Sequence, residues 1–206
     1  KTLTQVLATP GRKVQSVAQS SFDAWVKYYR PDENTANATV SYYTKGAMVA
    51  LALDLTLRAE GKTTLDAVMR RLWAHSQGGP IGENDILAAL QALAGRSMAR
   101  EIQAWVHGTD DLPLLPLLHA HGVECTHEAP TAAHRLGARL SENAGVLKVQ
   151  AVMRGGAAER AGLAAGDELL AFEQWRLRKP EDLALLGAHA RAGSLLVCRD
   201  QRLHTL

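Results

Sequence analysis

The sequence lacks the features that mark several large protein classes. Only two cysteines, Cys125 and Cys198, occur among its 206 residues, which excludes a multi-bridge disulfide framework and a Cys-x-x-Cys pair. One bridge between the two remains open, but so few cysteines are typical of a reducing compartment, and we expect a cytoplasmic protein. The longest apolar stretch, residues 47–57, is interrupted by Asp54. A bilayer-spanning helix needs about 20 mostly apolar residues, so no transmembrane helix is expected.

The sequence also lacks an excess of charge of one sign. Its 23 basic and 21 acidic residues are interspersed and give a net charge of +2. A protein that neutralises a row of phosphates gathers its basic residues on one face. We therefore expect no nucleic-acid partner.

The first residues lack both an initiator methionine and the apolar core of a signal peptide. We expect the chain to be cut from a longer protein. Residues that perform chemistry can then lie upstream of Lys1.

Apolar residues recur at helical spacing through the first 120 residues. The longest such pattern is apolar on nearly all sides for about four turns and ends before Gly61, which predicts a buried helix. Thr64 and Gly95 have the residue types of a helix N-cap and a helix C-terminus. The predicted helices are residues 15–29, 41–60, 65–76, 83–94, 97–108 and a short leucine-rich helix before Gly122.

Two of these helices carry a predicted buried face. In both, apolar residues follow one another at intervals that keep them on one side of a helix. The predicted buried residues are Val17, Phe22, Trp25, Val26 and Tyr29 in the first helix, and Leu65, Val68, Met69 and Leu72 in the third.

The pattern changes near residue 123, where short runs rich in valine, leucine and glycine begin. Such runs, separated by turn residues, are typical of strands. A helical part followed by a strand-rich part predicts two domains, with a linker in residues 127–135. The predicted strands are residues 123–129, 136–140, 146–152, 168–172, 194–199 and 202–206, and short helices are predicted at 157–161 and 180–189.

Residues 135–177, RLGARLSENAGVLKVQAVMRGGAAERAGLAAGDELLAFEQWRL, resemble bacterial PDZ domains. Several fixed spacings match together, and the resemblance extends over roughly residues 131–206. The matching motifs are Leu136-Gly137, Ala161-Gly162-Leu163 and Gly166-Asp167, each at its place between apolar strands.

The PDZ resemblance implies a groove that binds the C-terminus of a peptide. In such folds a glycine loop presents backbone N–H groups to the terminal carboxylate, and the peptide adds as a strand to the adjoining edge. Arg139 on that edge could equally be a charge that protects against aggregation, and packing between domains competes with ligand binding. The implied groove residues are Leu136, Gly137 and Ala138 in the loop, Arg139 and Leu140 on the edge strand, and Leu183 and Leu186 on the opposite helix.

Residues 20–58, SSFDAWVKYYRPDENTANATVSYYTKGAMVALALDLTLR, followed later by VHGTDDLPL, resemble the bacterial glycyl aminopeptidase family of zinc metallopeptidases. Members combine an N-terminal β domain, a thermolysin-like catalytic domain and a C-terminal PDZ module. The resemblance implies an α+β chain. Residues 1–126 would be the all-helical C-terminal part of a thermolysin-like peptidase domain, and residues 127–206 a PDZ-like β-sandwich or barrel with two short helices.

Zinc is the cofactor that the resemblance implies for the intact protein. The family binds it with His-Glu-x-x-His on one helix and a further carboxylate. This pattern does not occur among the histidines of the chain, which are residues 75, 107, 119, 121, 127, 134, 189 and 204. We expect the metal ligands to lie before Lys1 and the chain alone to be inactive.

Tyr43 is the candidate catalytic residue. The resemblance places the tyrosine of a Tyr-x-Lys-Gly motif, here residues 43–46, at the oxyanion that forms on the scissile carbonyl. A phenol stays protonated at neutral pH and can donate a hydrogen bond there. Without the motif, Tyr43 would be interpreted as a large residue at the start of a buried helix, which is the role we assign to Tyr42. Tyr43 shares a helical stripe with Ala47, Ala50 and Asp54.

Two other groups of polar residues receive no chemical role. Asp32 and Glu33 are adjacent loop carboxylates, which are usually solvated or cap a turn. A run of His119, His121, Cys125, His127 and His134 has spacings that fit no standard zinc site.

Two functions follow. In the first, the intact protein is a zinc-dependent aminopeptidase that acts on short peptides with a preference for N-terminal glycine. Its partners are the peptide substrate, the missing N-terminal part of the same protein, and a C-terminal peptide at the PDZ groove. In the second, the protein is a non-enzymatic scaffold whose PDZ groove binds peptides.

Overall fold

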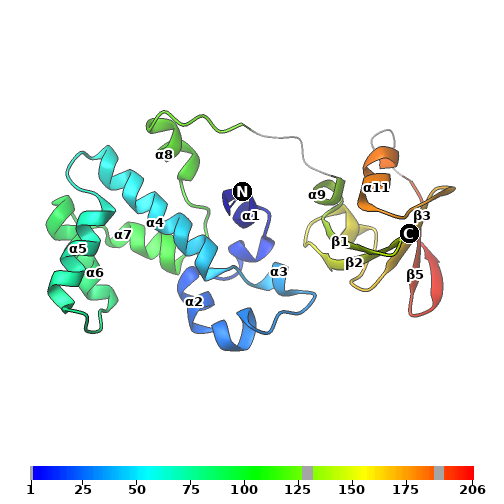
Figure 1. Ribbon diagram of the computed structural model, residues 1–206, viewed down its shortest axis with the longest axis horizontal. Helices are drawn as coiled ribbons and strands as arrows, with labels where there is room; N and C mark the ends of the chain where they lie inside the picture. Colours follow the sequence, from blue (N-terminus) through cyan, green and yellow to red (C-terminus); the bar gives the residue numbers. More distant parts are fainter. Residues whose placement is uncertain (1, 127–131, 188–192) are drawn as a thin grey trace. The chain divides into compact units, whose positions relative to one another are not determined.

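The computed structural model describes residues 2–126, 132–187 and 193–206 and contains two compact units (Figure 1). The first unit comprises the described residues of Lys1–Leu7, Arg12–Tyr28 and Thr39–His127. The second comprises the described residues of Ala8–Gly11, Tyr29–Ala38 and Glu128–Leu206. Helices build the first unit and an antiparallel sheet the second, so the chain has the predicted α+β class.

The first unit is built from helices joined by short loops. Their order begins with α1, the second half of the 3₁₀ helix η1 (Arg12 and Lys13), α2 and the π-helix η2, and continues after the long α4 with four further α-helices and the π-helix η3. The bounds are α1 Thr2–Leu7, η1 Pro10–Lys13, α2 Val17–Phe22, η2 Ala24–Tyr28, α4 Tyr42–Ala59, α5 Leu65–Ser76, α6 Glu83–Ala94, α7 Ala99–Ile102, η3 Gln103–His107 and α8 Leu114–Ala120.

The predicted helices α4, α5 and α6 are confirmed with their ends. Ser41 caps α4, and its side chain accepts a hydrogen bond from the Thr44 amide at 3.3 Å. Thr64 caps α5 in the same way, with the Ala67 amide as donor. Gly95 ends α6 in the left-handed conformation, with φ at 72°, which glycine adopts without steric cost. Caps are local, so the sequence alone indicates them.

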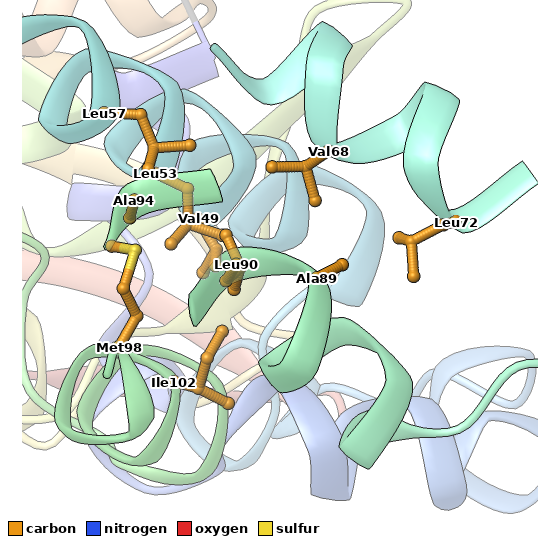
Figure 2. Packing of buried hydrophobic residues seen from close by; sticks show 10 residues of the cluster. All are labelled: Val49, Leu53, Leu57, Val68, Leu72, Ala89, Leu90, Ala94, Met98 and Ile102. Atoms are coloured by element: carbon orange, nitrogen blue, oxygen red, sulfur yellow. The ribbon is translucent and has the colours of Figure 1, made fainter. Parts of the chain in front are cut away.

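The core of the first unit lies between α4, α5 and α6, with α7 completing it. Figure 2 shows Leu53 of α4 and Leu90 of α6 within one apolar cluster, beside Val68 of α5. The remaining buried members are Val49, Leu57, Leu72, Ala89, Ala94, Met98 and Ile102. Burial of one such leucine contributes about 1.5–3 kcal/mol, so this cluster is the main source of stability for the helices around it.

The prediction for residues 15–29 is wrong in its continuity and in most of its buried face, although Val17 is half-buried and packs against the core of the first unit. The helix α2 ends at Phe22, and the wider π turn η2 follows. Phe22, Trp25 and Val26 are 90%, 79% and 68% exposed. The buried face is instead made by Ser16, Ser20 and Ala24, which are four residues apart. Small residues at that spacing let another helix approach closely, so the large apolar residues point outward.

Two smaller parts of the sequence predictions also differ from the structure. Met69 of α5 is 56% exposed, whereas Val68 and Leu72 are buried as predicted. Tyr29 is counted with the second unit and is 48% exposed. Met69 thus lies outside the buried stripe of α5, and Tyr29 lies beyond the end of η2.

The second unit is an antiparallel sheet with order β1-β2-β3-β5-β6, in which β4 pairs with β3. Strands β1 and β2 form a hairpin whose turn residues Ala144 and Gly145 both have positive φ, the conformation of a tight hairpin turn. The bounds are α3 Thr35–Ala38, α9 Ala132–Leu136, β1 Ala138–Asn143, β2 Val146–Val152, α10 Ala157–Arg160, β3 Glu168–Phe172, β4 Trp175–Arg176, α11 Pro180–Gly187, β5 Leu195–Arg199 and β6 Arg202–Thr205.

The alternating pattern of the sheet agrees with the sequence prediction. In β2, Leu147, Val149 and Ala151 are buried and their neighbours are exposed or half-buried. Because strand side chains alternate between faces, this is the pattern of a sheet that covers a core on one side. The buried residues of that core are Ala138, Leu147, Val149, Ala158, Leu163, Leu169, Leu177, Leu195 and Val197.

Some elements of the second part were not predicted or differ. The helix α9 and the short strand β4 carry no clear sequence signal. The predicted strand over residues 123–129 is wrong for 123–126, which form no regular element, and 127–129 lie outside the described residues. The predicted helix at 180–189 is present as α11, and residues 188 and 189 lie outside the described residues.

Asn37 of α3 ties its segment to the end of β2 within the second unit. Its side-chain amide donates to the Val152 carbonyl at 2.8 Å, and its side-chain oxygen accepts from the Arg154 amide at 2.8 Å. The same amide group also donates to the Asn34 side chain at 3.1 Å. Asn37 is 8% exposed, so it extends the hydrogen bonding of β2 as an additional strand would.

Asn37→Ala should weaken the attachment of residues 29–38 to β2. The substitution leaves two backbone groups unpaired, which costs about 2 kcal/mol in total. Hydrogen exchange of the Arg154 amide should accelerate about 30-fold, because this cost lowers the free energy of local opening. Asn34→Ala is the matched control and should change that rate by less than about fivefold. Equal rates in the wild type and Asn37→Ala would contradict the contact.

Candidate functional site

Tyr43 is the second residue of α4, directly after the capped start of the helix. The Ser41 hydroxyl, besides accepting from Thr44, donates to the Tyr28 hydroxyl at 3.3 Å. The Tyr43 side chain is 59% exposed. The start of α4 thus presents a phenol at the surface of the first unit from a backbone fixed by its cap.

Three tyrosine rings gather around the start of α4. The rings of Tyr42 and Tyr43 are 4.2 Å apart, and the Tyr28 ring is 5.3 Å from that of Tyr42 and 6.0 Å from that of Tyr43. Tyr28 comes from η2, so this cluster joins the π turn to α4. Aromatic pairs at these separations contribute about 0.5–1.5 kcal/mol each, which restricts the rotation of the Tyr43 ring.

The helical stripe that contains Tyr43 is the exposed side of α4. Ala47 is exposed and Ala50 and Asp54 are half-buried. The Asp54 carboxylate accepts from the Leu65 amide at 2.9 Å and from Arg58 at 2.7 Å. Burial raises the pKa of Asp54, but the bonds to Arg58 and Leu65 outweigh it and hold the pKa below its ordinary value. Asp54 thus caps α5 as a carboxylate.

Lys45 lies on the opposite side of α4 and is 2% exposed. Its ammonium group donates to the Arg12 carbonyl at 3.1 Å. Burial lowers the pKa of Lys45 below its ordinary value, with Asp111 opposing this and Lys13 and Arg12 adding to it. The motif of residues 43–46 includes Lys45 but does not indicate its burial. Lys45 is the only charged residue between Tyr42 and Leu53, which is a signal that could have indicated a special position.

The residues that the structure describes contain no group of three or more histidine, cysteine, aspartate or glutamate side chains that could hold a metal ion. His107 instead contacts Glu83 at 2.7 Å, and His75 lies 3.3 Å from Asp85. Cys125 is exposed and is a free thiol. The Asp32 carboxylate accepts from the Asn34 amide and the Thr35 hydroxyl, so it caps a turn. The described residues therefore do not fit a zinc ion.

The seven residues that were predicted to form a groove come from α9, β1 and α11 and from Gly137, which lies between α9 and β1. Leu136 ends α9, and Gly137 connects it to β1 with φ at 74°. A side chain at Gly137 would come within 2.8 Å of the Cα atom of Gly156, so only glycine fits there. The Gly137 amide donates to the His134 carbonyl at 3.2 Å, which assigns that N–H group to the end of α9.

Strand β1 is the terminal strand of the sheet order and pairs with β2. Ala138 is buried, whereas Arg139 is exposed and is followed by a register shift before Leu140. Such a shift twists a strand locally. Leu136, Leu140, Leu183 and Leu186 are all half-buried and pack against the core of the second unit. The leucines that were predicted to line opposite sides of a groove thus pack against one apolar core.

Asp167 directly precedes β3 and is fully buried, with an exposed fraction of 0%. Its carboxylate accepts two hydrogen bonds from Arg199, both at 2.7 Å, and one from the Ala164 amide at 2.9 Å. Burial raises the pKa of Asp167, but Arg199 and the Ala164 amide outweigh it, so the pKa lies below its ordinary value. The Gly166-Asp167 motif therefore serves folding.

No helix among the described residues is both long and apolar enough to cross a membrane.

Comparison with known proteins finds similarity to one protein family and to solved structures. Residues 1–49, which include Tyr43, match the model of the M61 glycyl aminopeptidase family. The crystal structure of an aminopeptidase N family protein from Idiomarina loihiensis is 29% identical in sequence and has a TM-score of 0.88. The match covers 100% of this chain and 38% of that protein. No curated protein matches. These findings confirm the resemblance inferred from the sequence, which is to part of an M61-type peptidase.

Proposed function

We propose that the intact protein is a zinc-dependent aminopeptidase in which Tyr43 donates a hydrogen bond to the oxyanion of the transition state. The observation that carries this proposal is the placement of Tyr43. Its phenol is 59% exposed at the capped start of α4, within the residues that match the peptidase family. A surface position beside an otherwise packed core suits a group that meets a substrate held by other parts of the protein.

The chemistry of Tyr43 is that of a fixed hydrogen-bond donor. Attack on a peptide carbonyl moves negative charge onto its oxygen, and a donor placed there stabilises that charge most in the transition state. A phenol carries its own O–H donor, so Tyr43 needs no proton transfer before it donates. The ring contacts with Tyr28 and Tyr42 restrict where the hydroxyl can lie.

The helical residues up to 126 would then belong to a thermolysin-like catalytic domain. Its zinc ion would be held by polypeptide outside this chain, since the described residues do not provide a set of ligands. We accordingly propose that this chain alone does not hydrolyse peptides.

Peptide hydrolysis by the intact protein tests the proposal. It should release glycine from short peptides with N-terminal glycine, and a chelator such as 1,10-phenanthroline should abolish release until zinc is added back. The 206-residue chain, assayed alone, should release none. The same peptide with an acetylated N-terminus is the control and should resist cleavage by an aminopeptidase. Chelator-resistant hydrolysis, or hydrolysis by the chain alone, would refute the assignment.

A second candidate function is peptide binding by residues 127–206 as a PDZ domain. It is favoured by β1, which is the terminal strand of the described sheet and follows the left-handed Gly137. A peptide could add along β1, with Leu136, Gly137 and Ala138 at its carboxylate, Arg139 and Leu140 along its backbone, and Leu183 and Leu186 against its side chains. If the upstream polypeptide lacks a zinc site, the protein would be a scaffold.

Titration with free C-terminal peptides tests this groove. Amide resonances of residues 136–140 should shift in NMR spectra, and the same peptides with an amidated C-terminus should shift them at least about tenfold less, because a carboxylate accepts stronger hydrogen bonds. Unchanged resonances with a broad peptide library would exclude the groove.

The cytoplasm is the compartment we propose, since Cys125 and Cys198 are free thiols.

A further inference from the structure

Lys45 places an ammonium group in the interior of the first unit, two residues after Tyr43. Residues two apart on a helix lie about 200° apart, so the two side chains leave α4 on opposite sides. The exposed fractions agree with this, at 59% for Tyr43 and 2% for Lys45. Lys45 therefore belongs to the side of α4 that is anchored, and Tyr43 to the side that faces outward.

The surroundings of Lys45 do not neutralise it directly. Its ammonium group donates to the backbone carbonyl of Arg12 at 3.1 Å and forms no ion pair among the residues that the structure describes. The nearby Asp111 carboxylate is bound instead by Arg12 at 2.7 Å and Lys13 at 3.0 Å. A buried charge without an ion-pair partner destabilises a fold relative to an apolar side chain of similar size. Stability therefore does not explain this lysine.

The space around Lys45 also excludes direct contact with a substrate. The adjoining cavity measures about 20 Å³, close to the volume that one water molecule needs. It is lined by apolar residues of α1, α4 and α8 together with Arg12 and Asp111. Lys45 can affect catalysis only by fixing the position of the residues around it.

Lys45 holds the first turn of α4 in place. The Ser41 cap and the ring of Tyr28 hold this turn on one side, and the bond from Lys45 to the Arg12 carbonyl holds it on the other. A helix can slide or rotate slightly while its apolar contacts adapt, whereas a hydrogen bond to a fixed carbonyl specifies one position. We propose that Lys45 is a positioning residue, which fixes the register of α4 and thereby the place of the Tyr43 hydroxyl. This inference rests on the proposed function of Tyr43.

A double-mutant cycle in the intact enzyme tests the proposal. Lys45→Met removes the ammonium group and keeps the length and apolar volume of the side chain. It should lower kcat about 10- to 100-fold with little change in KM, because a small displacement of a catalytic group costs that much. Lys45→Arg keeps the donor and should retain kcat within about fivefold. In the Tyr43→Phe background, Lys45→Met should lower kcat no further, since both changes remove one interaction.

Hydrogen exchange supplies a readout that does not need the metal or the substrate. The Lys45 amide donates to the Ser41 carbonyl at 2.9 Å in the first turn of α4. In the 206-residue chain, Lys45→Met should accelerate exchange of this amide about tenfold and leave the amides of Leu53 and Leu57 unchanged, because the loss is local. If Lys45→Met does not fold, Lys45→Gln takes its place, since glutamine is neutral and too short to keep the contact.

The possible failures are distinguishable. If Tyr43→Phe has full activity, the proposed function fails and the positioning role fails with it. If Tyr43→Phe is impaired, three results would show that the positioning role alone is wrong. Lys45→Met could keep full activity, it could lower kcat further in the Tyr43→Phe background, or Lys45→Arg could lose as much activity as Lys45→Met. Unchanged exchange at the Lys45 amide would also overturn it.

Discussion

Replacing Tyr43 by phenylalanine in the intact enzyme should lower kcat about 100- to 1000-fold, the loss that follows removal of one oxyanion donor. The ring stays in place, so its contacts with Tyr28 and Tyr42 and the start of α4 should be preserved. KM and zinc content should change little, because the hydroxyl acts mainly in the transition state. Steady-state kinetics with a glycyl peptide, together with metal analysis, measure all three quantities.

Tyr42→Phe is the matched control for this experiment. Tyr42 is adjacent in sequence and half-buried, and its ring lies 4.2 Å from that of Tyr43. We assign it a structural role, so its loss of one hydroxyl should leave kcat within about threefold of the wild type. If both variants lose activity equally, the effect belongs to the aromatic cluster and not to one phenol.

Asp167→Ala should have the largest effect on stability. It removes the partner of Arg199 in a bidentate ion pair whose carboxylate is completely buried. The change leaves the Ala164 amide without its acceptor and Arg199, whose side chain is 35% exposed, without its carboxylate, so it should cost about 2–4 kcal/mol. Native-state hydrogen exchange in β2 and β3 should report this as a lower unfolding free energy of the second unit, while α5 and α6 keep theirs.

Asp182→Ala is the control within the same unit. The Asp182 carboxylate accepts from the amides of Arg178 and Lys179 at the start of α11, and no ion pair joins it to a cation in the part of the chain that the structure describes. Loss of such a cap costs about 1 kcal/mol. An Asp167→Ala variant no less stable than Asp182→Ala would show that the ion pair does not hold the sheet together.

The same pair makes the second unit sensitive to acid. The folded-state pKa of Asp167 lies below the ordinary value of 3.8. A depressed folded-state pKa contributes stability that is fully present above the unfolded-state pKa and is lost as the pH falls through the folded value. The wild type should therefore lose stability below about pH 4, and Asp167→Asn should lose less over the same range.

The parts of the fold that the sequence predicted are those specified by local signals. The caps at Thr64 and Gly95 and the strict alternation of β2 depend on neighbouring residues and were predicted with their ends. The face of α2 was mistaken because its contact is made by Ser16, Ser20 and Ala24, whereas apolar periodicity weighs only large residues. Asn37 was missed because its partners, Val152 and Arg154, are more than 100 residues away.

The candidate site shows the same division. Tyr43 could be singled out because a short motif carried it, and the structure adds that its side chain is exposed at a capped helix start. The burial of Lys45 could not be derived from the motif, since it depends on the Arg12 carbonyl and on the packing of α1 and α8. In the strand-rich part, the spacing of the glycines indicated a turn. The close contact between Gly137 and Gly156 could not be predicted from that spacing and is seen only in the structure.

A crystal structure of the intact protein with a phosphinic peptide, which imitates the tetrahedral transition state, would show whether Tyr43 meets the reacting carbonyl. We expect the Tyr43 hydroxyl within about 2.7–3.1 Å of the phosphinic oxygen that occupies the oxyanion position. A Tyr43 hydroxyl directed away from the bound inhibitor, with another group donating to that oxygen, would contradict it.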